Sequence, residues 1–231
     1  MGVGSFTIEQ IGSGAADAAI DAWATKVAAQ GHPFFFRPWW EMNGNWGYPW
    51  QIASGVTPAE YVQAWQRFRT RADAAGATNI TWVWNPNTYV EGGTVPDPAP
   101  WYPGDAYVDW MGFDGYNQGA QTVAAAYDTI YARLQQLAPS KPIIVSETAS
   151  AEGGSVSKVS WINDVFAKLP TRYPQIKAWC WFNWNILEGG TRHTWPIESS
   201  SSAQSAFATG IASPYFKEPV GSLPFGKVPV P

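Results

Sequence analysis

Short apolar runs bounded by turn residues alternate along this chain with segments of helical periodicity. This alternation is typical of repeated strand-helix units around a parallel sheet, so the sequence predicts the α/β class. We expect strands over residues 34–41, 80–87, 109–117, 142–148 and 178–184. We expect helices over residues 15–30, 58–75, 122–137, 157–169 and 203–212, with Thr57 as the N-cap of the second.

The length of 231 residues suffices for one domain, which we place at residues 1–216. Residues 217–231 are rich in proline and glycine, so we expect an extended tail or the start of a linker there. Residues 1–5 lack the basic and apolar regions of a signal peptide, and no apolar run is long enough for a membrane helix. We therefore expect no membrane partner.

The balance of charge excludes several classes of ligand. Only 14% of the residues are charged, the net charge is −4, and the basic residues are scattered without runs. A nucleic-acid partner is therefore not expected, and a neutral ligand is. The 15 tryptophans suit stacking on sugar faces, although core packing accounts for more than half of them in our interpretation.

Metal and thiol chemistry find little support in the sequence. Cys180 is the single cysteine, and its apolar neighbours predict a buried structural thiol. His32 and His193 are the two histidines, and they are not spaced as a ligand pair. We expect no metal site and no cofactor.

Polar residues gather at the carboxyl ends of the expected strands, which is where parallel barrels place catalytic groups. They are Glu41 with Asn43, Asn85 with Asn87, Asp114 with Tyr116, Glu147, and Asn183 with Trp184. Alternation along an extended strand predicts that Arg37, Trp39 and Glu41 share one face. A carboxylate on the rim, paired with a cation, remains the alternative for either glutamate.

Five segments in this order resemble glycoside hydrolase family 26, and the similarity extends to about Phe216. The segments are RPWWEMNGNW (37–46), WYPGDAYVD (101–109), GFDGYN (112–117), SETA (146–149) and WPIESS (195–200). That family contains β-mannanases, mixed-linkage β-glucanases and β-1,3-xylanases on a (β/α)8 barrel. A full barrel of this type needs about 250 residues. The resemblance implies a partial TIM-type barrel here, corresponding to strands four to eight, with about five parallel strands and outer helices.

The resemblance further implies that Glu41 is the general acid/base and Glu147 the nucleophile. Retaining hydrolysis needs two such carboxylates, one protonated and one ionised, about 5–5.5 Å apart. The aromatic side chains around Glu41 are expected to raise its pKa by desolvation. By the same resemblance we expect a substrate-binding set of Arg37, Trp40, Trp46, Asn85, Tyr116, Trp184 and Trp195.

Several of these residues have structural alternatives. Arg37 is expected to orient a carboxylate, but it could instead neutralise a buried acid. Tyr116 is expected near the nucleophile, with a core role as the alternative. Trp184 is expected as a sugar platform at the end of the last strand. Trp40 stands where most of the family has histidine. Tryptophan cannot accept a hydrogen bond or titrate, so the contact that histidine makes with the sugar is altered and the identity of the substrate stays open.

The expected function is endo-acting retaining hydrolysis of a neutral plant-type β-glycan, with β-1,4-mannan favoured and mixed-linkage β-glucan the alternative. A non-catalytic polysaccharide-binding protein and a fragment without a function of its own remain open, as does exo action. The partner is then a polysaccharide or oligosaccharide, and the resemblance implies an extracellular protein. Open strand edges also lead us to expect a homodimer, or else a terminal segment folded across the gap.

Overall fold

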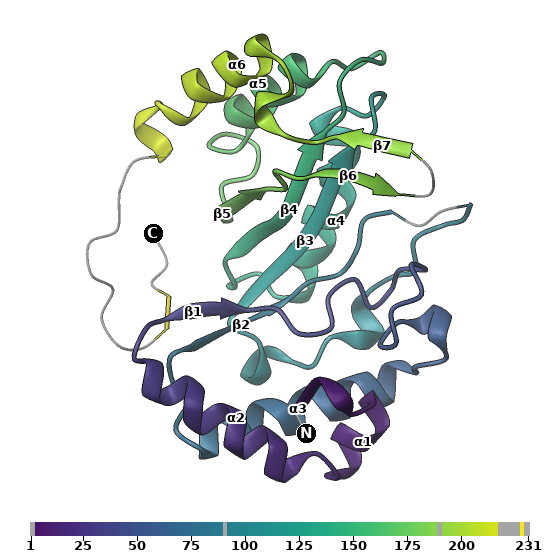
Figure 1. Cartoon of the computed structure of the whole chain (residues 1–231), viewed down its shortest axis with the longest axis vertical. Helices are drawn as coiled ribbons and strands as arrows, with labels where there is room; N and C mark the ends of the chain where they lie inside the picture. The colour runs from purple at the N-terminus through teal and green to yellow at the C-terminus, as the bar shows by residue number, and fades with distance from the viewer. Residues whose placement is uncertain (1–2, 90–91, 189–190, 217–226, 229–231) are drawn as a thin grey trace. The chain divides into compact units, whose positions relative to one another are not determined.

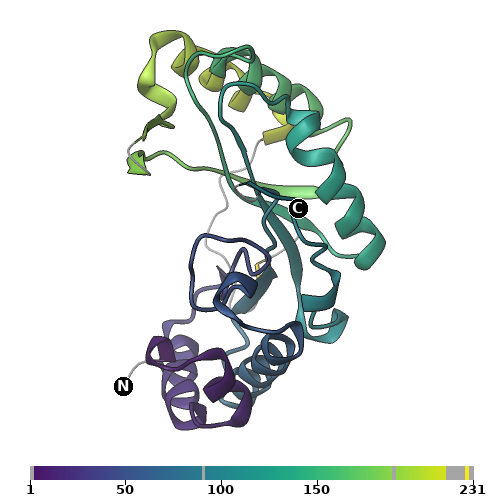
Figure 2. The same cartoon turned by 90° about the vertical axis from the view of Figure 1, so that its right-hand side faces the viewer.

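The computed structural model describes residues 3–89, 92–188, 191–216 and 227–228 (Figures 1 and 2). The chain divides into two compact units. The first unit comprises residues 1–112 with 221–231, and the second comprises residues 113–220. Of the expected tail over residues 217–231, only 227 and 228 belong to the described residues.

A five-stranded sheet with the strand order β1-β2-β3-β4-β5 runs through the chain. Its strands are β1 (Phe34–Phe36), β2 (Ile80–Trp84), β3 (Trp110–Asn117), β4 (Ile143–Ser150) and β5 (Ile176–Trp181). The ladders β1-β2, β2-β3 and β4-β5 are parallel, and helices separate most successive strands along the chain. This topology confirms the expected class, a partial (β/α) barrel of about five parallel strands.

The helices follow the expected pattern, with one addition. They are α1 (Ile8–Ser13), α2 (Asp17–Gln30), α3 (Pro58–Ala74), α4 (Val123–Leu137), α5 (Lys158–Lys168) and α6 (Ser201–Ile211). Short 3-10 turns occur at η1 (Val3–Ser5), η2 (Ile52–Ser54), η3 (Ala99–Trp101), η4 (Asp105–Tyr107), η5 (Ile197–Ser199) and η6 (Pro214–Phe216). Thr57 is confirmed as the N-cap of α3, where it forms a capping box with Glu60. The sequence interpretation missed α1, although Thr7 and Gln10 form the same kind of box there.

In the first unit, α1, α2 and α3 lie side by side (Figures 1 and 2). Arg67 on α3 binds Asp17 on α2 through two nitrogen–oxygen contacts of 2.8 and 2.7 Å. Beneath these charges, the ring of Phe68 packs against the rings of Trp23 and Trp82 at centroid distances of 5.2 and 5.4 Å. Aromatic packing therefore forms much of the core of this unit.

In the second unit, α5 and α6 pack together over β5 (Figure 1). The ring of Phe166 on α5 lies 5.6 Å from Trp179 and 5.4 Å from Phe207. A Cβ at Gly210 would lie 2.0 Å from the ring of Phe166, so only glycine fits this crossing. Cys180 is exposed, and the expectation of a buried thiol is wrong, because β5 is an edge strand whose other face carries the apolar packing.

Three strands end three or more residues before the predicted position. The first ends at Phe36 instead of residue 41, the second ends at Trp84 instead of residue 87, and the last covers Ile176–Trp181 instead of residues 178–184. An antiparallel pair, β6 (Asn185–Glu188) and β7 (Thr191–Thr194), follows where the sequence suggested no further strand. Among the described residues, none of the helices has the length and apolar character needed to cross a bilayer.

Candidate active site

The chain leaves β1 through a tight turn. Strand pairing stops at Phe36, and Pro38 has no N–H with which to continue a ladder. Trp39 then adopts a φ of 50° and Glu41 a φ of 56°. The expectation that Arg37, Trp39 and Glu41 share one face of an extended strand is therefore wrong.

Both positive φ angles belong to residues other than glycine, whose Cβ makes the left-handed region unfavourable. The cost is about 1–2 kcal/mol for each residue. Strain of this kind persists only where the surrounding structure imposes it, and it concentrates at functional sites. The turn that carries Glu41 thus contains both of the non-glycine residues with positive φ among the described residues.

The backbone of Glu41 is held on both sides. Its N–H donates to the carbonyl of Asn85 (2.7 Å), and its carbonyl accepts from the N–H of Gly44 (2.8 Å) and from Nε2 of Gln51 (2.9 Å). A Cβ at Gly44 would lie 2.7 Å from Gln51 Nε2 and 3.0 Å from the carbonyl oxygen of Glu41, so a larger residue would crowd this hydrogen bond. The Glu41 residue is only 9% exposed. Asn85, expected to contact substrate, is buried and contributes this main-chain carbonyl.

Arg37 and Trp40 lie together beside the turn. The guanidinium carbon of Arg37 lies 5.2 Å from the centroid of the Trp40 ring, which is within the range of a cation–π contact. The Trp40 ring also packs against Trp50 at 4.8 Å and Tyr48 at 5.6 Å. The structure therefore brings these two predicted substrate-binding residues together in one aromatic group.

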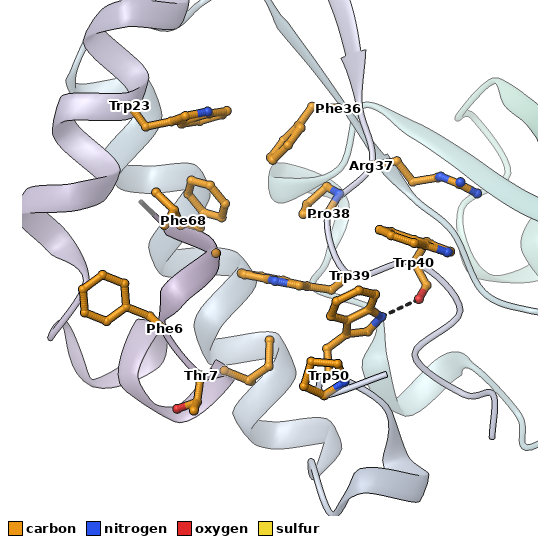
Figure 3. A pocket seen from close by; sticks show the side chains of 14 residues that line it. Phe6, Thr7, Trp23, Phe36, Arg37, Pro38, Trp39, Trp40, Trp50 and Phe68 are labelled. Carbon is orange, nitrogen blue, oxygen red and sulfur yellow. Dashed lines mark hydrogen bonds between the residues drawn. The ribbon is translucent and has the colours of Figure 1, made fainter. Parts of the chain in front are cut away.

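A cavity of about 390 Å³ adjoins the same turn (Figure 3). Its walls are largely aromatic, and the rings include Trp23, Phe36, Trp39, Trp40, Trp50 and Phe68. In Figure 3 the Nε1 of Trp50 points at the carbonyl of Trp40, and the distance is 2.7 Å. Trp39 and Trp40 thus connect the Glu41 turn to the wall of this cavity.

Trp46 forms an exposed aromatic pair with Tyr89. The two ring centroids are 6.0 Å apart with 26° between the planes, and the residues are 38% and 49% exposed. Asn43 and Asn87 connect the loops that carry the pair: Asn43 Oδ1 accepts from the N–H of Asn87 (2.8 Å), and Asn87 Oδ1 accepts from the N–H of Tyr89 (3.2 Å). Stacked, half-exposed rings of this kind present a flat surface to a sugar.

In the second unit, Glu147 lies within β4 at an irregularity of the ladder. Val145 pairs with Trp179 and Thr148 pairs with Trp181, so β4 has two residues between these pairs where β5 has one. This is a β-bulge, a feature that re-aims side chains and is common beside active sites. Glu147 is half-buried at this bulge.

The hydroxyl of Tyr116 donates a 2.7 Å hydrogen bond to Oε2 of Glu147. The Tyr116 ring in turn lies 5.3 Å from Trp195, whose other aromatic neighbour is His193 at 4.7 Å with 9° between the planes. Trp195 is only 3% exposed. The structure therefore brings Tyr116 and Glu147 together as predicted. Trp195 packs against the Tyr116 ring and has little ring surface left for a ligand.

Trp184 lies beyond the end of β5, not at a strand end as expected, and is 65% exposed. This exposure excludes a core role for the ring. Its neighbour Asn183 is bound to other side chains: Nδ2 donates to both carboxylate oxygens of Glu198 at 3.1 Å, and Oδ1 accepts from the N–H of Ile197 at 2.7 Å.

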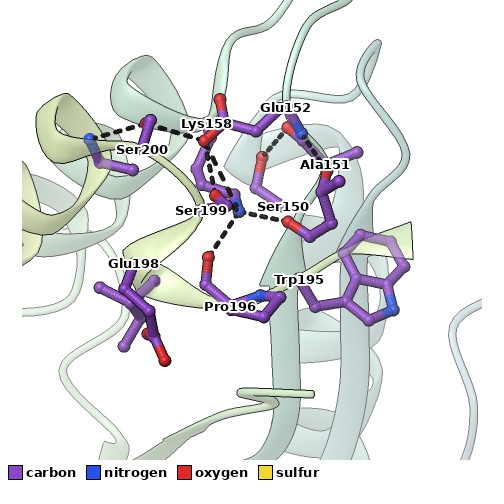
Figure 4. A network of polar contacts seen from close by, with 12 residues as sticks. Ser150, Ala151, Glu152, Lys158, Trp195, Pro196, Glu198, Ser199 and Ser200 are labelled. Atoms are coloured by element: carbon purple, nitrogen blue, oxygen red, sulfur yellow. Dashed lines mark hydrogen bonds and ion pairs between the residues drawn. The ribbon is translucent and has the colours of Figure 1, made fainter. Parts of the chain in front are cut away.

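A buried lysine fixes the segment that follows β7 (Figure 4). The side chain of Lys158, at the start of α5, is 0% exposed. Its ammonium group donates to the carbonyls of Thr194 and Pro196 (2.9 Å for the latter) and to Oγ of Ser199 (2.6 Å). Lys158 therefore holds the backbone on both sides of Trp195.

Glu152 completes this network, with its Oε1 3.9 Å from Lys158 Nζ. Burial lowers the pKa of Lys158, and the charges of Glu152 and Glu198 oppose that shift. Burial pushes the pKa of Glu152 upward, but hydrogen bonds from Ser199 and Ser200 and the Lys158 charge make the net shift a lowering. The acid is thus held in its ionised form beside the lysine.

Sequence reasoning did not single out Gln51, Tyr61, Tyr89 or Lys158. Tyr89 follows the polar pair Asn85 and Asn87 closely, so its position after a strand was an available signal. Lys158 and Gln51 have no such signal, because their importance depends on carbonyl groups 36 and 10 residues away along the chain.

The described residues contain no group of three or more His, Cys, Asp or Glu that could hold a metal ion. The side chains gathered in each unit instead suit acid-base and nucleophilic chemistry: a nearly buried carboxyl group in the first, and a carboxyl group bound by a phenol in the second. Each unit also carries an exposed indole ring, Trp46 in the first and Trp184 in the second.

Comparison with known proteins agrees with these features. The model of glycosyl hydrolase family 26 matches residues 14–193. Endoglucanase H of Acetivibrio thermocellus is 37% identical over 213 residues, which are 88% of this chain and 23% of that protein. A mannan endo-1,4-beta-mannosidase of Bacillus subtilis is 29% identical over 154 residues, which are 63% of this chain and 39% of that protein.

Among solved structures, a Bacillus subtilis mannanase superposes with a TM-score of 0.56 at 25% identity. The match covers 84% of this chain and 51% of the mannanase chain. This chain therefore spans about half of that structure, and less than half of the two relatives above. The family model covers most of the sequence, and the chain belongs to glycosyl hydrolase family 26.

Proposed function

We propose that the protein is a retaining endo-β-glycoside hydrolase that cleaves a neutral β-glycan, with Glu147 as nucleophile and Glu41 as general acid/base. The observation that carries the proposal is the 2.7 Å hydrogen bond from the Tyr116 hydroxyl to Oε2 of Glu147. A phenol that donates to one carboxylate oxygen orients the group for attack. Family membership supports the reaction class.

The proposed reaction has two steps. Glu147 attacks the anomeric carbon while Glu41 donates its proton to the departing glycosidic oxygen, so that a glycosyl ester forms as the glycosidic bond breaks. Glu41 then takes a proton from water, which attacks the same carbon and releases Glu147 as a carboxylate. This sequence requires the two carboxyl groups to approach within about 5–5.5 Å of each other.

A β-glucan is the first substrate that we propose to test. The relative with 37% identity over 88% of this chain is named an endoglucanase, and Trp40 stands in place of the histidine expected in most of the family. β-1,4-Mannan, the substrate favoured by the motifs alone, is the second. It is supported by the mannan endo-1,4-beta-mannosidases that match 63–67% of the chain.

Reducing-end release from mixed-linkage β-glucan, β-1,4-mannan and β-1,3-xylan tests the proposal, with Glu147→Ala as the control. Hydrolysis that the variant loses, with β-configured products detected first by NMR, supports retaining catalysis. Binding to a glycan without release of reducing ends by the wild-type protein would instead support a non-catalytic binding protein. Inversion of configuration in the first products would contradict the role of Glu147.

A further inference from the structure

We propose that Tyr61, Trp50 and Gln51 form a carbonyl clamp that holds the left-handed turn Trp39–Glu41 and thereby sets the direction of the Glu41 carboxyl group. They would be positioning residues for the general acid, and none of them was expected from the motifs. The inference rests on the proposed role of Glu41.

Each of the three consecutive carbonyl groups in the turn accepts a hydrogen bond from one of these side chains. The Tyr61 hydroxyl donates to the Trp39 carbonyl at 3.2 Å. Trp50 Nε1 donates to the Trp40 carbonyl at 2.7 Å (Figure 3). The third contact is the 2.9 Å bond from Gln51 Nε2 to the carbonyl of Glu41. Each carbonyl group of the turn thus has its own side-chain donor.

The clamp coincides with the strained part of the chain. Trp39 and Glu41 are the non-glycine residues with positive φ among the described residues. A turn that the local sequence disfavours must be stabilised by groups outside it. Tyr61 comes from α3, and Trp50 and Gln51 come from the loop before η2, so all three donors lie outside the turn.

Two of the three donors are fully buried. Tyr61 and Gln51 are both 0% exposed. Gln51 Oε1 accepts from the N–H of Tyr48 at 3.1 Å, which leaves its Nε2 directed at Glu41. Burial raises the pKa of Tyr61 well above its usual value of 10.0, so its hydroxyl stays a donor throughout the working pH range.

A general acid must lie within hydrogen-bond reach of the oxygen that it protonates, and small misplacements reduce the rate steeply. Loosening the turn should therefore impair protonation of the leaving group, while attack by Glu147 should be unaffected. This gives the clamp a signature that a merely structural role lacks: the loss should depend on the leaving group.

The test is Tyr61→Phe, which removes one hydroxyl and keeps the ring, with Gln51→Met as a second variant of similar shape. We expect kcat on the natural glycan to fall about tenfold or more, and kcat on a dinitrophenyl glycoside of the same sugar to change less than about twofold. Tyr131→Phe is the matched control, because its hydroxyl accepts from the N–H of Gln175 in the other unit. It should leave both rates unchanged.

Glu41→Ala in the same assay separates two kinds of failure. If Glu41→Ala shows no dependence on the leaving group, the proposed role of Glu41 fails. If Glu41→Ala shows it and both clamp variants do not, the clamp is wrong. Crystal structures of the two clamp variants give a readout without turnover: φ at Trp39 or Glu41 should leave the left-handed region, and unchanged angles in both variants would overturn the inference even for an inactive protein.

Discussion

The ring of Trp46 lies nearly parallel to the ring of Tyr89, with 6.0 Å between the centroids. Both side chains are large, amphipathic and more than a third exposed, so their stacking does not serve to fill a core. Such a pair offers a preorganised platform for the apolar face of a sugar ring.

We expect Trp46→Ala and Tyr89→Ala each to weaken glycan binding about 2- to 13-fold, because an aromatic contact contributes about 0.5–1.5 kcal/mol beyond its burial. The double variant should lose less than the sum, since each ring orients the other. Isothermal titration with an oligosaccharide measures the effect. Ile52→Ala, an exposed apolar residue of the same unit, should have no effect on affinity.

Glu147→Ala should abolish turnover on every substrate, since no other group forms the glycosyl ester. Glu41→Ala should slow natural glycans by about 10²–10⁴-fold but spare substrates whose leaving groups need no proton. Steady-state kinetics on a glycan and on a dinitrophenyl glycoside distinguish the two roles. Equal losses by both variants on both substrates would rule out this division.

Lys158→Met should lower the free energy of unfolding by roughly 2–4 kcal/mol, because the change removes a buried ammonium group and leaves the acceptors at Pro196 and Ser199 without their donor. Lys168→Met is the matched control on the same helix, where a half-exposed lysine pairs with Asp164. It should cost less than about 1 kcal/mol. Urea denaturation measures both, and similar losses would show that the buried network adds no stability.

The stability of the first unit should depend on Asp17 at acid pH. Its pKa is lowered chiefly by the hydrogen bond from Arg67, so the paired carboxylate stabilises the fold above the ordinary value of 3.8. This contribution is lost as the pH falls through the lowered pKa. Asp17→Asn should therefore reduce the difference in unfolding free energy between pH 6 and pH 3. Glu9→Gln, an exposed change on α1, should preserve that difference.

We propose a homodimer for this chain, because β1 and β5 are the edges of its sheet among the described residues and both carry large aromatic side chains. Light scattering should then give about twice the 25.3 kDa of one chain. A dilute, well-folded monomer would instead favour closure by the chain itself. In that case the contacts of residues 227 and 228 with Asp109 and Thr81 would be the first to test by truncation.

The elements with strong local signals could be predicted from the sequence. Thr57, Thr122 and Ser157 accept from backbone N–H groups at the helix starts that their side chains predict. The apolar strands were found, but their ends were not, because tertiary contacts and not local pattern determine where pairing stops. Pro38 was a signal that the first strand ends early, because proline cannot donate a ladder hydrogen bond.

The candidate site shows the same limit. Glu41, Glu147 and Tyr116 could be named from motifs, and the hydrogen bond between the last two confirms their proximity. Tyr61 is separated from the carbonyl that it binds by 22 residues, and no periodicity reports such a contact. The β6-β7 pair was missed although Gly189 and Gly190 form a dipeptide common in hairpins.

At the bulge beside Glu147, regular strand pairing and the proposed position of the nucleophile place opposite demands on the chain. Deleting Ser146 would restore regular pairing between β4 and β5 and recover ladder hydrogen bonds, so selection for a more stable sheet favours the shorter strand. The same deletion would place Glu147 opposite Cys180 in a regular ladder and so change the direction of its carboxyl group. Engineering that stabilises this protein by regularising its strands should therefore spare β4, since the irregularity carries the nucleophile that we propose.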